Sequence, residues 1–219
     1  MRFINRTQAG RLLAKKLAKY ANRENVVVLG IPRGGLPVAF QVAQALHVPL
    51  DVFICRKLGV PGQEELALGA VATGGVRVIN DEIVGLLGIP QERIDPIAAV
   101  QQRELERREQ LYRGVRPPLQ VRGKTVILID DGVATGSSML AAITALRRLE
   151  PARIVVAVPV APFSTFERLR QEADEVICLD TPEEFYAIGQ FYEDFSQTTD
   201  EEVCEFLRRS GHPAARKVA

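Results

Sequence analysis

Two adjacent carboxylates and a run of small and hydroxyl residues stand together in the middle of the chain. The run Asp130-Asp-Gly-Val-Ala-Thr-Gly-Ser-Ser138 follows an apolar segment at 125–129 and opens a segment with helical character. Glycines allow a tight turn in which backbone N–H groups point inward, and hydroxyls and a helix N-terminus add donors and partial positive charge. Such a loop can hold a phosphomonoester without any lysine or arginine.

The two acids suit a ligand that donates hydrogen bonds or carries positive charge. When ionised, Asp130 and Asp131 only accept hydrogen bonds, which fits the vicinal hydroxyls of a sugar or a hard cation such as Mg²⁺. A ribose 5-phosphate matches this order, with its phosphate on the loop and its hydroxyls on the carboxylates. The alternative is a tight strand-to-helix turn with an acidic cap, but a cap needs fewer polar residues than this loop contains.

A second glycine-rich loop follows the apolar run at 26–30. Gly30-Ile-Pro-Arg-Gly-Gly35 has neither the spacing of a dinucleotide-binding fingerprint nor that of a P-loop. It supplies a Gly-Gly pair, one arginine and the start of a helix, which together can bind an anion. A Gly-Gly pair before a helix is also common in ordinary turns, so this loop alone is a weak signal.

Apolar runs that alternate with helical patterns position both loops. Strands are predicted at 26–30, 51–55, 125–129, 153–159 and 175–179, and helices at 36–46, 139–149 and 163–172. This alternation predicts right-handed βαβ crossovers and a doubly wound, mostly parallel α/β sheet flanked by helices. Ligands of such sheets bind beyond the carboxyl ends of the strands, where both loops fall.

The remaining segments are expected to lie outside this alternation of strands and helices. An amphipathic helix opens the chain, residues 57–75 are predicted to form a long loop that includes a hairpin (67–72 with 76–79), and a helical insertion spans about 81–114. We expect residues 1–180 to form the core domain. The acidic and aromatic residues 181–219 are expected to form a C-terminal appendage.

Composition excludes several classes of function. The 219 residues carry 28 Lys+Arg and 27 Asp+Glu, a net charge of +1, which argues against the basic field of a non-specific nucleic-acid binder. Two histidines and three scattered cysteines indicate neither a histidine-rich metal site nor a disulfide scaffold. The longest apolar stretch, at 154–163, is interrupted by two prolines, and no apolar leader is visible. We expect a cytoplasmic protein without nucleic-acid or membrane partners.

The segment Val126–Ser138 resembles the phosphoribosyl diphosphate (PRPP) signature of type I phosphoribosyltransferases over 13 residues. The resemblance implies that Asp130 and Asp131 hold the ribose hydroxyls. It also implies that Mg²⁺ binds together with PRPP, near these two acids, directly or through water. The residues implied to bind the 5-phosphate are Gly132, Val133, Ala134, Thr135, Gly136, Ser137 and Ser138.

The loop Gly30–Gly35 is similar to the pyrophosphate-binding loop of that family. The resemblance implies a cis peptide between Pro32 and Arg33. The residues it assigns to the diphosphate are Pro32, Arg33, Gly34 and Gly35, and Arg56 and Lys57 could add positive charge. For Arg56 and Lys57 a solvated strand end is an equal alternative. Asp130, Asp131 and Arg33 are the residues expected to act in catalysis.

One departure from the family pattern concerns the base. Members that act on 6-oxopurines carry an aspartate where this chain has Ala134, and alanine cannot accept a proton from the purine ring. The base is therefore left open. The family's variable hood over the sheet corresponds to the appendage 181–219, and a homodimer is expected.

Three functions fit these residues. The first is a Mg²⁺-dependent enzyme that transfers ribose 5-phosphate from PRPP to a small nitrogenous base, or the reverse. The alternative is a non-catalytic regulator that binds PRPP. The third is an unrelated phosphosugar-binding α/β protein.

Overall fold

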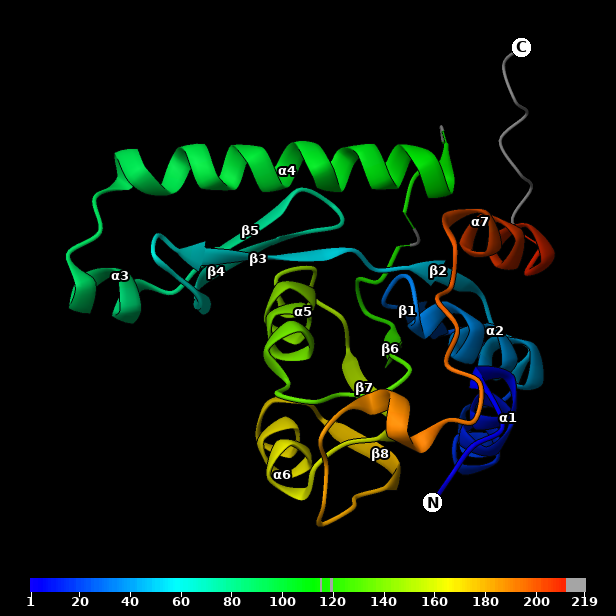
Figure 1. Ribbon diagram of the computed structural model, residues 1–219. Coiled ribbons are helices and arrows are strands. Elements are labelled where there is room, and N and C mark those ends of the chain that lie inside the picture. Colours follow the sequence, from blue (N-terminus) through cyan, green and yellow to red (C-terminus); the bar gives the residue numbers. More distant parts are fainter. Residues whose placement is uncertain (115, 119, 212–219) are drawn as a thin grey trace.

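The computed structural model describes residues 1–114, 116–118 and 120–211, apart from the side chains of residues 64 and 65 (Figure 1). Residues 212–219 of the expected appendage lie outside this range. Two sheets are present: a five-stranded sheet in the order β2-β1-β6-β7-β8 and a three-stranded sheet in the order β3-β4-β5. The strands are β1 (Val26–Gly30), β2 (Leu50–Val52), β3 (Cys55–Val60), β4 (Gln63–Ala72), β5 (Val76–Ile79), β6 (Thr125–Ile129), β7 (Arg153–Val160) and β8 (Glu175–Asp180). The helices are α1 (Arg6–Lys16), α2 (Gly35–Leu46), α3 (Asp81–Leu87), α4 (Gln91–Arg113), α5 (Ser137–Arg147), α6 (Phe163–Glu172) and α7 (Asp200–Arg209), with short 3-10 turns η1 (Ala18–Tyr20) and η2 (Ile188–Phe191).

The five-stranded sheet confirms the predicted doubly wound α/β core. All four strand pairs are parallel, and β1 and β6 are buried along their whole length. Side chains such as Val28 and Ile127 pack with α1 and α2 on one face, whereas Val27 and Leu128 pack with α5 and α6 on the other. Continuous burial on both faces explains why these strands are runs of apolar residues without alternation.

The predicted long loop at 57–75 is wrong, because most of it forms strands β3 and β4. These strands form an antiparallel hairpin that turns at Pro61 and Gly62 and extends, with β5, into an arm beside the core (Figure 1). Leu58, Val60 and Leu68 are buried in a cluster that includes α4 residues. The hairpin at 67–72 and 76–79 is confirmed as part of β4 paired with β5.

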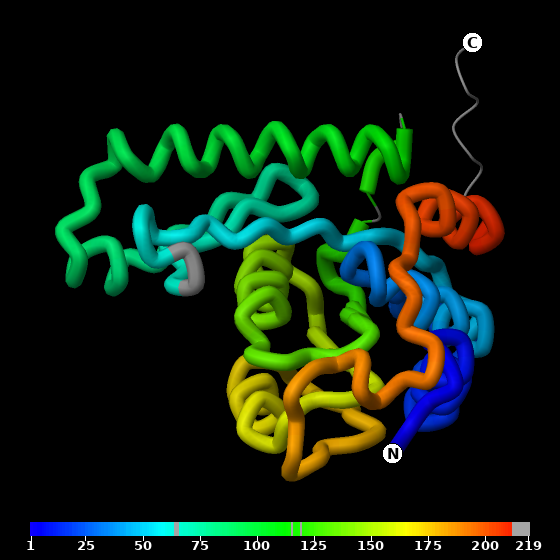
Figure 2. Tube along the Cα trace, viewed as in Figure 1, coloured from blue at the N-terminus to red at the C-terminus, as the bar shows by residue number. Residues whose placement is uncertain are grey.

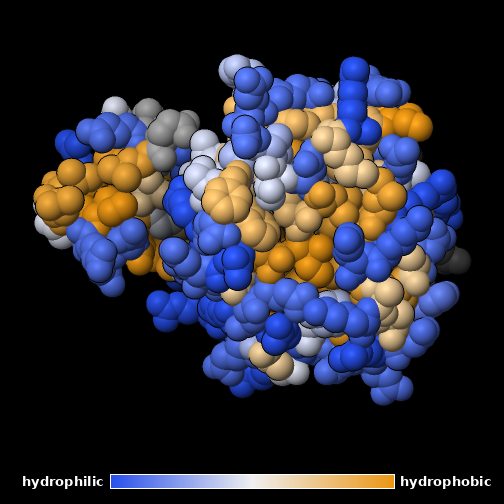
Figure 3. Space-filling view, turned by 90° about the horizontal axis from the view of Figure 1, so that it is seen from below, coloured by the Kyte–Doolittle hydropathy of each residue, from blue (hydrophilic) through white to orange (hydrophobic). Residues whose placement is uncertain are grey.

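The helical insertion is present as α3 and α4. Helix α4 begins at Gln91 rather than at Pro96, which lies inside the helix. None of the residues of α3 is buried, and Leu86 and Leu87 are exposed. Apolar surface accordingly covers the end of the arm where α3 lies, at the left of Figure 3. Within the described part of the chain, no helix combines the length and the hydropathy needed to cross a membrane.

The segment after β8 packs onto the core and includes one helix that was not predicted. Residues 181–199 run past α1 and lead into α7 (Figure 2). Phe3 forms a parallel bridge with Tyr192, and α7 buries Val203 and Leu207 in the cluster that holds α2 and α4 residues. The N-terminal residues therefore pack against the segment that follows β8.

Candidate active site

The two glycine-rich loops lie side by side at the carboxyl ends of β1 and β6. These strands are neighbours, with Gly30 paired to Ile129, and the N–H of Ile31 donates to the carbonyl of Ile129 at 2.8 Å. A Cβ added at Gly35 would lie 2.7 Å from the carbonyl oxygen of Ile129, and one at Gly34 would lie 2.1 Å from Oδ2 of Asp131. Both glycines are thus required by the close approach of the loops.

The loop at 30–35 contains the expected cis peptide between Pro32 and Arg33. The side chain of Arg33 is 36% exposed, and its guanidinium lies 3.8 Å from Asp200 at the start of α7. The same Asp200 oxygen accepts a hydrogen bond of 2.5 Å from the hydroxyl of Tyr112 on α4. A long, partly exposed ion pair contributes little stability, so an anionic ligand can compete with Asp200 for Arg33.

Asp131 is buried, Asp130 is half-buried, and their neighbours hold both acids in place. The N–H of Asp131 donates to Oδ1 of Asp130 at 2.8 Å, and the hydroxyl of Tyr192 donates to the carbonyl of Asp131 at 2.5 Å. The Nε of Arg6, at the start of α1, donates to Oδ2 of Asp131 at 2.7 Å. Asp131 is 7% exposed.

Both carboxyl groups titrate away from their ordinary range. Burial, followed by the charge of Asp131, raises the pKa of Asp130 well above that of a free aspartate. Burial also raises the pKa of Asp131, although Arg6 opposes this shift. Strongly perturbed acids that lie next to a cavity are characteristic of functional sites.

The loop after the acids surrounds a cavity of about 210 Å³ at the N-terminus of α5. Gly136 adopts φ +80° and turns the chain into the helix, whose first N–H groups have no intrahelical acceptor. The hydroxyls of Thr135 and Ser137 lie 3.3 Å apart. The lining residues are Asp130, Gly132, Val133, Ala134, Thr135, Gly136, Ser137, Ser138, Met139 and Ile188. The predicted phosphate-loop residues are therefore gathered around one concave site that is rich in donors.

Neighbouring elements fix the shape of this loop. The N–H of Val133 donates to the carbonyl of Val160 at the end of β7 at 2.9 Å. The hydroxyl of the buried Thr165 on α6 donates to the carbonyl of Ala134 at 2.6 Å. These bonds attach the loop to β7 and α6 and occupy the carbonyls of Val160 and Ala134.

The C-terminal segment covers the same cavity. Ile188 is one of its lining residues, and a Cβ added at Gly132 would lie 2.6 Å from Cγ2 of Ile188. Sequence reasoning missed Ile188, Arg6, Tyr192 and Asp200 as site residues. They come from elements that are distant in the chain, so no local pattern connects them to the acid pair.

Arg56 and Lys57 lie in a different place. The Nε of Arg56 donates to Gln101 of α4 at 2.6 Å, and burial together with Arg108 lowers the pKa of Arg56. Both residues line a groove of about 590 Å³ between β3 and α4 that shares no lining residue with the cavity at 130–138. These two cations thus line a groove separate from the cavity at 130–138, and their role in binding the diphosphate stays a prediction.

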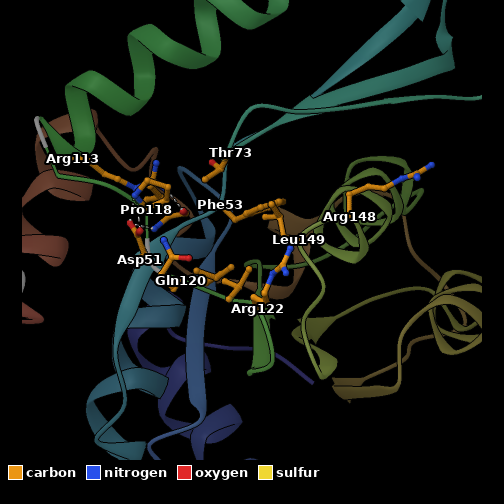
Figure 4. A pocket seen from close by; sticks show the side chains of 13 residues that line it. Asp51, Phe53, Thr73, Arg113, Pro118, Gln120, Arg122, Arg148 and Leu149 are labelled. Carbon is orange, nitrogen blue, oxygen red and sulfur yellow. Dashed lines mark hydrogen bonds and ion pairs between the residues drawn. The ribbon is translucent and has the colours of Figure 1, made fainter.

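Another cavity, of about 310 Å³, lies between the core and the base of the arm (Figure 4). Arg113 reaches from the end of α4 to Asp51, with Nε–O distances of 2.9 and 3.0 Å, and also donates to the carbonyl of Val52. Both charged side chains are buried and satisfied. Their contacts attach α4 to the sheet edge at β2.

The acid pair is compatible with a substrate-bound magnesium ion. Among the described residues, no group of three or more histidine, cysteine or acidic side chains could enclose a metal. Mg²⁺ commonly keeps several waters and binds one or two carboxylates plus substrate phosphates. Asp130 and Asp131 would supply those carboxylates, so the donor set fits an ion that arrives with a diphosphate.

Comparisons with known proteins agree with this geometry. The family model described as "Phosphoribosyl transferase domain" matches residues 4–196. The Mycobacterium tuberculosis protein named "Putative phosphoribosyl transferase Rv0571c" is 45% identical over 208 residues, which are 95% of this chain and 47% of that protein. The chain thus spans about half the length of the curated relatives it matches.

Solved structures resemble the chain over almost its whole length. The protein TT1426 from Thermus thermophilus superimposes with a TM-score of 0.88 and 45% identity, covering 98% of this chain and 100% of that one. The AQ2163 protein from Aquifex aeolicus, at 13% identity and a TM-score of 0.51, covers 96% of this chain and 87% of that one. This second likeness concerns the fold alone.

Proposed function

The chain belongs to the phosphoribosyl transferase domain family, and on that premise we propose that it transfers ribose 5-phosphate between PRPP and a nitrogenous base. The forward reaction releases pyrophosphate, and the reverse reaction consumes it. One observation carries the proposal: a pair of adjacent acids, a donor-rich cavity and a second glycine-rich loop meet within contact distance at one end of the sheet.

The cavity at 130–138 fits the 5-phosphate. N–H groups without intrahelical acceptors at the start of α5 and the hydroxyls of Thr135, Ser137 and Ser138 supply donors, and the helix end supplies partial positive charge. In this pose the ribose hydroxyls donate to Asp130 and Asp131, which border the cavity. Their charge-assisted hydrogen bonds fix the sugar with C1 toward the other loop.

The loop at 32–35 and Arg33 would face the diphosphate. Displacement at C1 passes through an oxocarbenium-like state in which negative charge grows on the leaving group, so fixed donors and one guanidinium stabilise the transition state. When bound with PRPP, Mg²⁺ supplies Lewis-acid stabilisation of the leaving group. The remaining contribution is positioning of base and sugar, which requires no protein nucleophile.

The rest of the proposal concerns the base, the cellular location and the oligomeric state. Ile188 places an apolar side chain over Gly132, so the C-terminal segment would cover the bound sugar phosphate, while the base itself is left open. The chain would work in the cytoplasm as a homodimer without nucleic-acid or membrane partners. The balanced net charge and the exposed apolar surface of α3 support this view.

The test is release of pyrophosphate from PRPP in the presence of Mg²⁺ and a panel of purine and pyrimidine bases. Turnover with any base supports the enzyme, whereas saturable PRPP binding without turnover would favour a regulator. Absence of both would overturn the proposal. Glu150→Gln should leave PRPP binding and turnover unchanged, because this exposed acid precedes β7 at the opposite end of the sheet.

A further inference from the structure

Arg6 is the one cation in direct contact with the acid pair among the described residues. It is the first residue of α1, and its side chain is only 12% exposed. Besides the 2.7 Å bond to Asp131, its Nη1 donates to the carbonyl of Ser196 at 2.7 Å. Its guanidinium lies 4.0 Å from the ring centre of Phe195. An arginine is thus fixed on three sides between the N-terminal helix and the C-terminal segment.

These contacts constrain one particular carboxylate. Oδ2 of Asp131 accepts a hydrogen bond from Arg6 and occupies the space that a side chain at Gly34 would fill. The hydroxyl of Tyr192 holds the backbone carbonyl of Asp131. Because Arg6 holds Oδ2, the carboxylate keeps one orientation, and its remaining lone pairs can accept a ribose hydroxyl. Side chains held in one orientation by surrounding contacts bind a ligand without an ordering cost.

We propose that Arg6 is a positioning residue for ribose recognition, which sets the orientation of Asp131 and joins α1 to the segment 192–196 over the site. The inference rests on the proposed function, since it concerns the same sugar. Arginine suits this role because its planar fork donates to two acceptors while its face stacks on an aromatic ring. The point charge of lysine cannot do all three at once.

A plain structural role for Arg6 predicts a different pattern of effects. If Arg6 only anchored the N-terminal helix, its loss would weaken every sugar phosphate equally. If Arg6 orients Asp131, its loss weakens only ligands whose hydroxyls use that carboxylate. Ribose 5-phosphate and 2,3-dideoxyribose 5-phosphate separate these cases, because both carry the phosphate and only the first carries both hydroxyls.

The experiment is calorimetric titration of the full chain with these two compounds, for wild type, Arg6→Gln and Arg6→Lys. We expect Arg6→Gln to weaken ribose 5-phosphate about tenfold or more, the loss typical of a charge-assisted hydrogen bond. The affinity of Arg6→Gln for the dideoxy compound should differ from that of wild type by less than about twofold. Arg6→Lys should recover part of the loss. Lys19→Gln is the matched control, because Lys19 pairs with Glu175 at 2.7 Å outside the site.

The outcomes separate this inference from the proposed function. If wild type binds neither compound, the proposed function fails. If wild type binds ribose 5-phosphate and Arg6→Gln loses nothing, or loses equally on both compounds, the positioning role of Arg6 is refuted and the proposed function stands. If a thermal melt shows that Arg6→Gln does not fold, the affinities of Arg6→Lys for the two compounds test the positioning role instead.

Discussion

Gly34→Ala adds a single methyl group at the contact between the two loops. Gly34 has φ −60° and ψ −32°, a conformation that alanine adopts without strain. The added Cβ would nevertheless lie 2.1 Å from Oδ2 and 2.7 Å from Cγ of Asp131. The substitution therefore tests the loop contact and not backbone freedom.

The loss of stability follows from how far the added Cβ and the Asp131 carboxylate must move apart. Restoring a Cβ–oxygen separation of 3.0 Å requires the carboxylate or the loop to move by about 0.9 Å. Asp131 cannot swing aside freely, because Arg6 holds Oδ2 and Tyr192 holds the backbone. Overpacking of this kind costs about 1–3 kcal/mol, which lowers the melting temperature by about 2–12 °C in a chain of this size. A displacement near 1 Å in a site lowers catalytic efficiency by about 100-fold.

The assay combines thermal melts with titration of Mg²⁺–PRPP. We expect Gly34→Ala to melt lower than wild type and to bind PRPP much more weakly. Gly85→Ala is the control, because this residue lies in α3 and its added Cβ meets nothing within 4 Å. Replacing it should raise helix propensity and leave binding unchanged. Wild-type melting and PRPP affinity in Gly34→Ala would refute the proposed contact between the loop and Asp131.

Three further substitutions probe the supports of the site. Thr165→Val removes the bond to the Ala134 carbonyl, so we expect weaker inorganic phosphate binding in calorimetry, and unchanged affinity would argue against loop support. Tyr192→Phe frees the carbonyl of Asp131 and should lower the melting temperature by about 2–6 °C, whereas an unaltered melt would contradict it. Asp130→Asn should raise the melting temperature near pH 8, because burial and Asp131 raise the pKa of Asp130 and its ionised form destabilises the fold. That gain should shrink as pH falls toward the unfolded pKa near 4, and a constant gain would refute the titration argument.

The core and both loops could be predicted because their signals are local. Continuous apolar runs identify strands buried on both faces, and the glycine-rich loops directly follow β1 and β6. Parallel neighbours place such loops at the same edge of the sheet without further information. The arm could not be predicted in this way, since Leu58 and Leu68 of its hairpin stand among glycines and are buried only because α4 covers them.

The C-terminal helix had a usable local signal. Thr199 accepts from the N–H of Glu202 while the Glu202 carboxylate accepts from the N–H of Thr199, and a Thr-x-x-Glu spacing marks this capping box in the sequence. No comparable signal exists for Arg6, which meets Asp131 across 125 residues. Its partner is set by how α1 packs on the sheet, a property of the whole fold.

The most direct measurement of the central claim is calorimetric titration of Mg²⁺–PRPP into wild type and Asp131→Asn. The claim is that the acid pair and the loop at 132–138 together bind a ribose phosphate. It predicts saturable binding to wild type and affinity about tenfold or more lower in Asp131→Asn, because an amide replaces an ionised acceptor of hydrogen bonds. No binding to wild type, or equal affinity in both proteins, would contradict it.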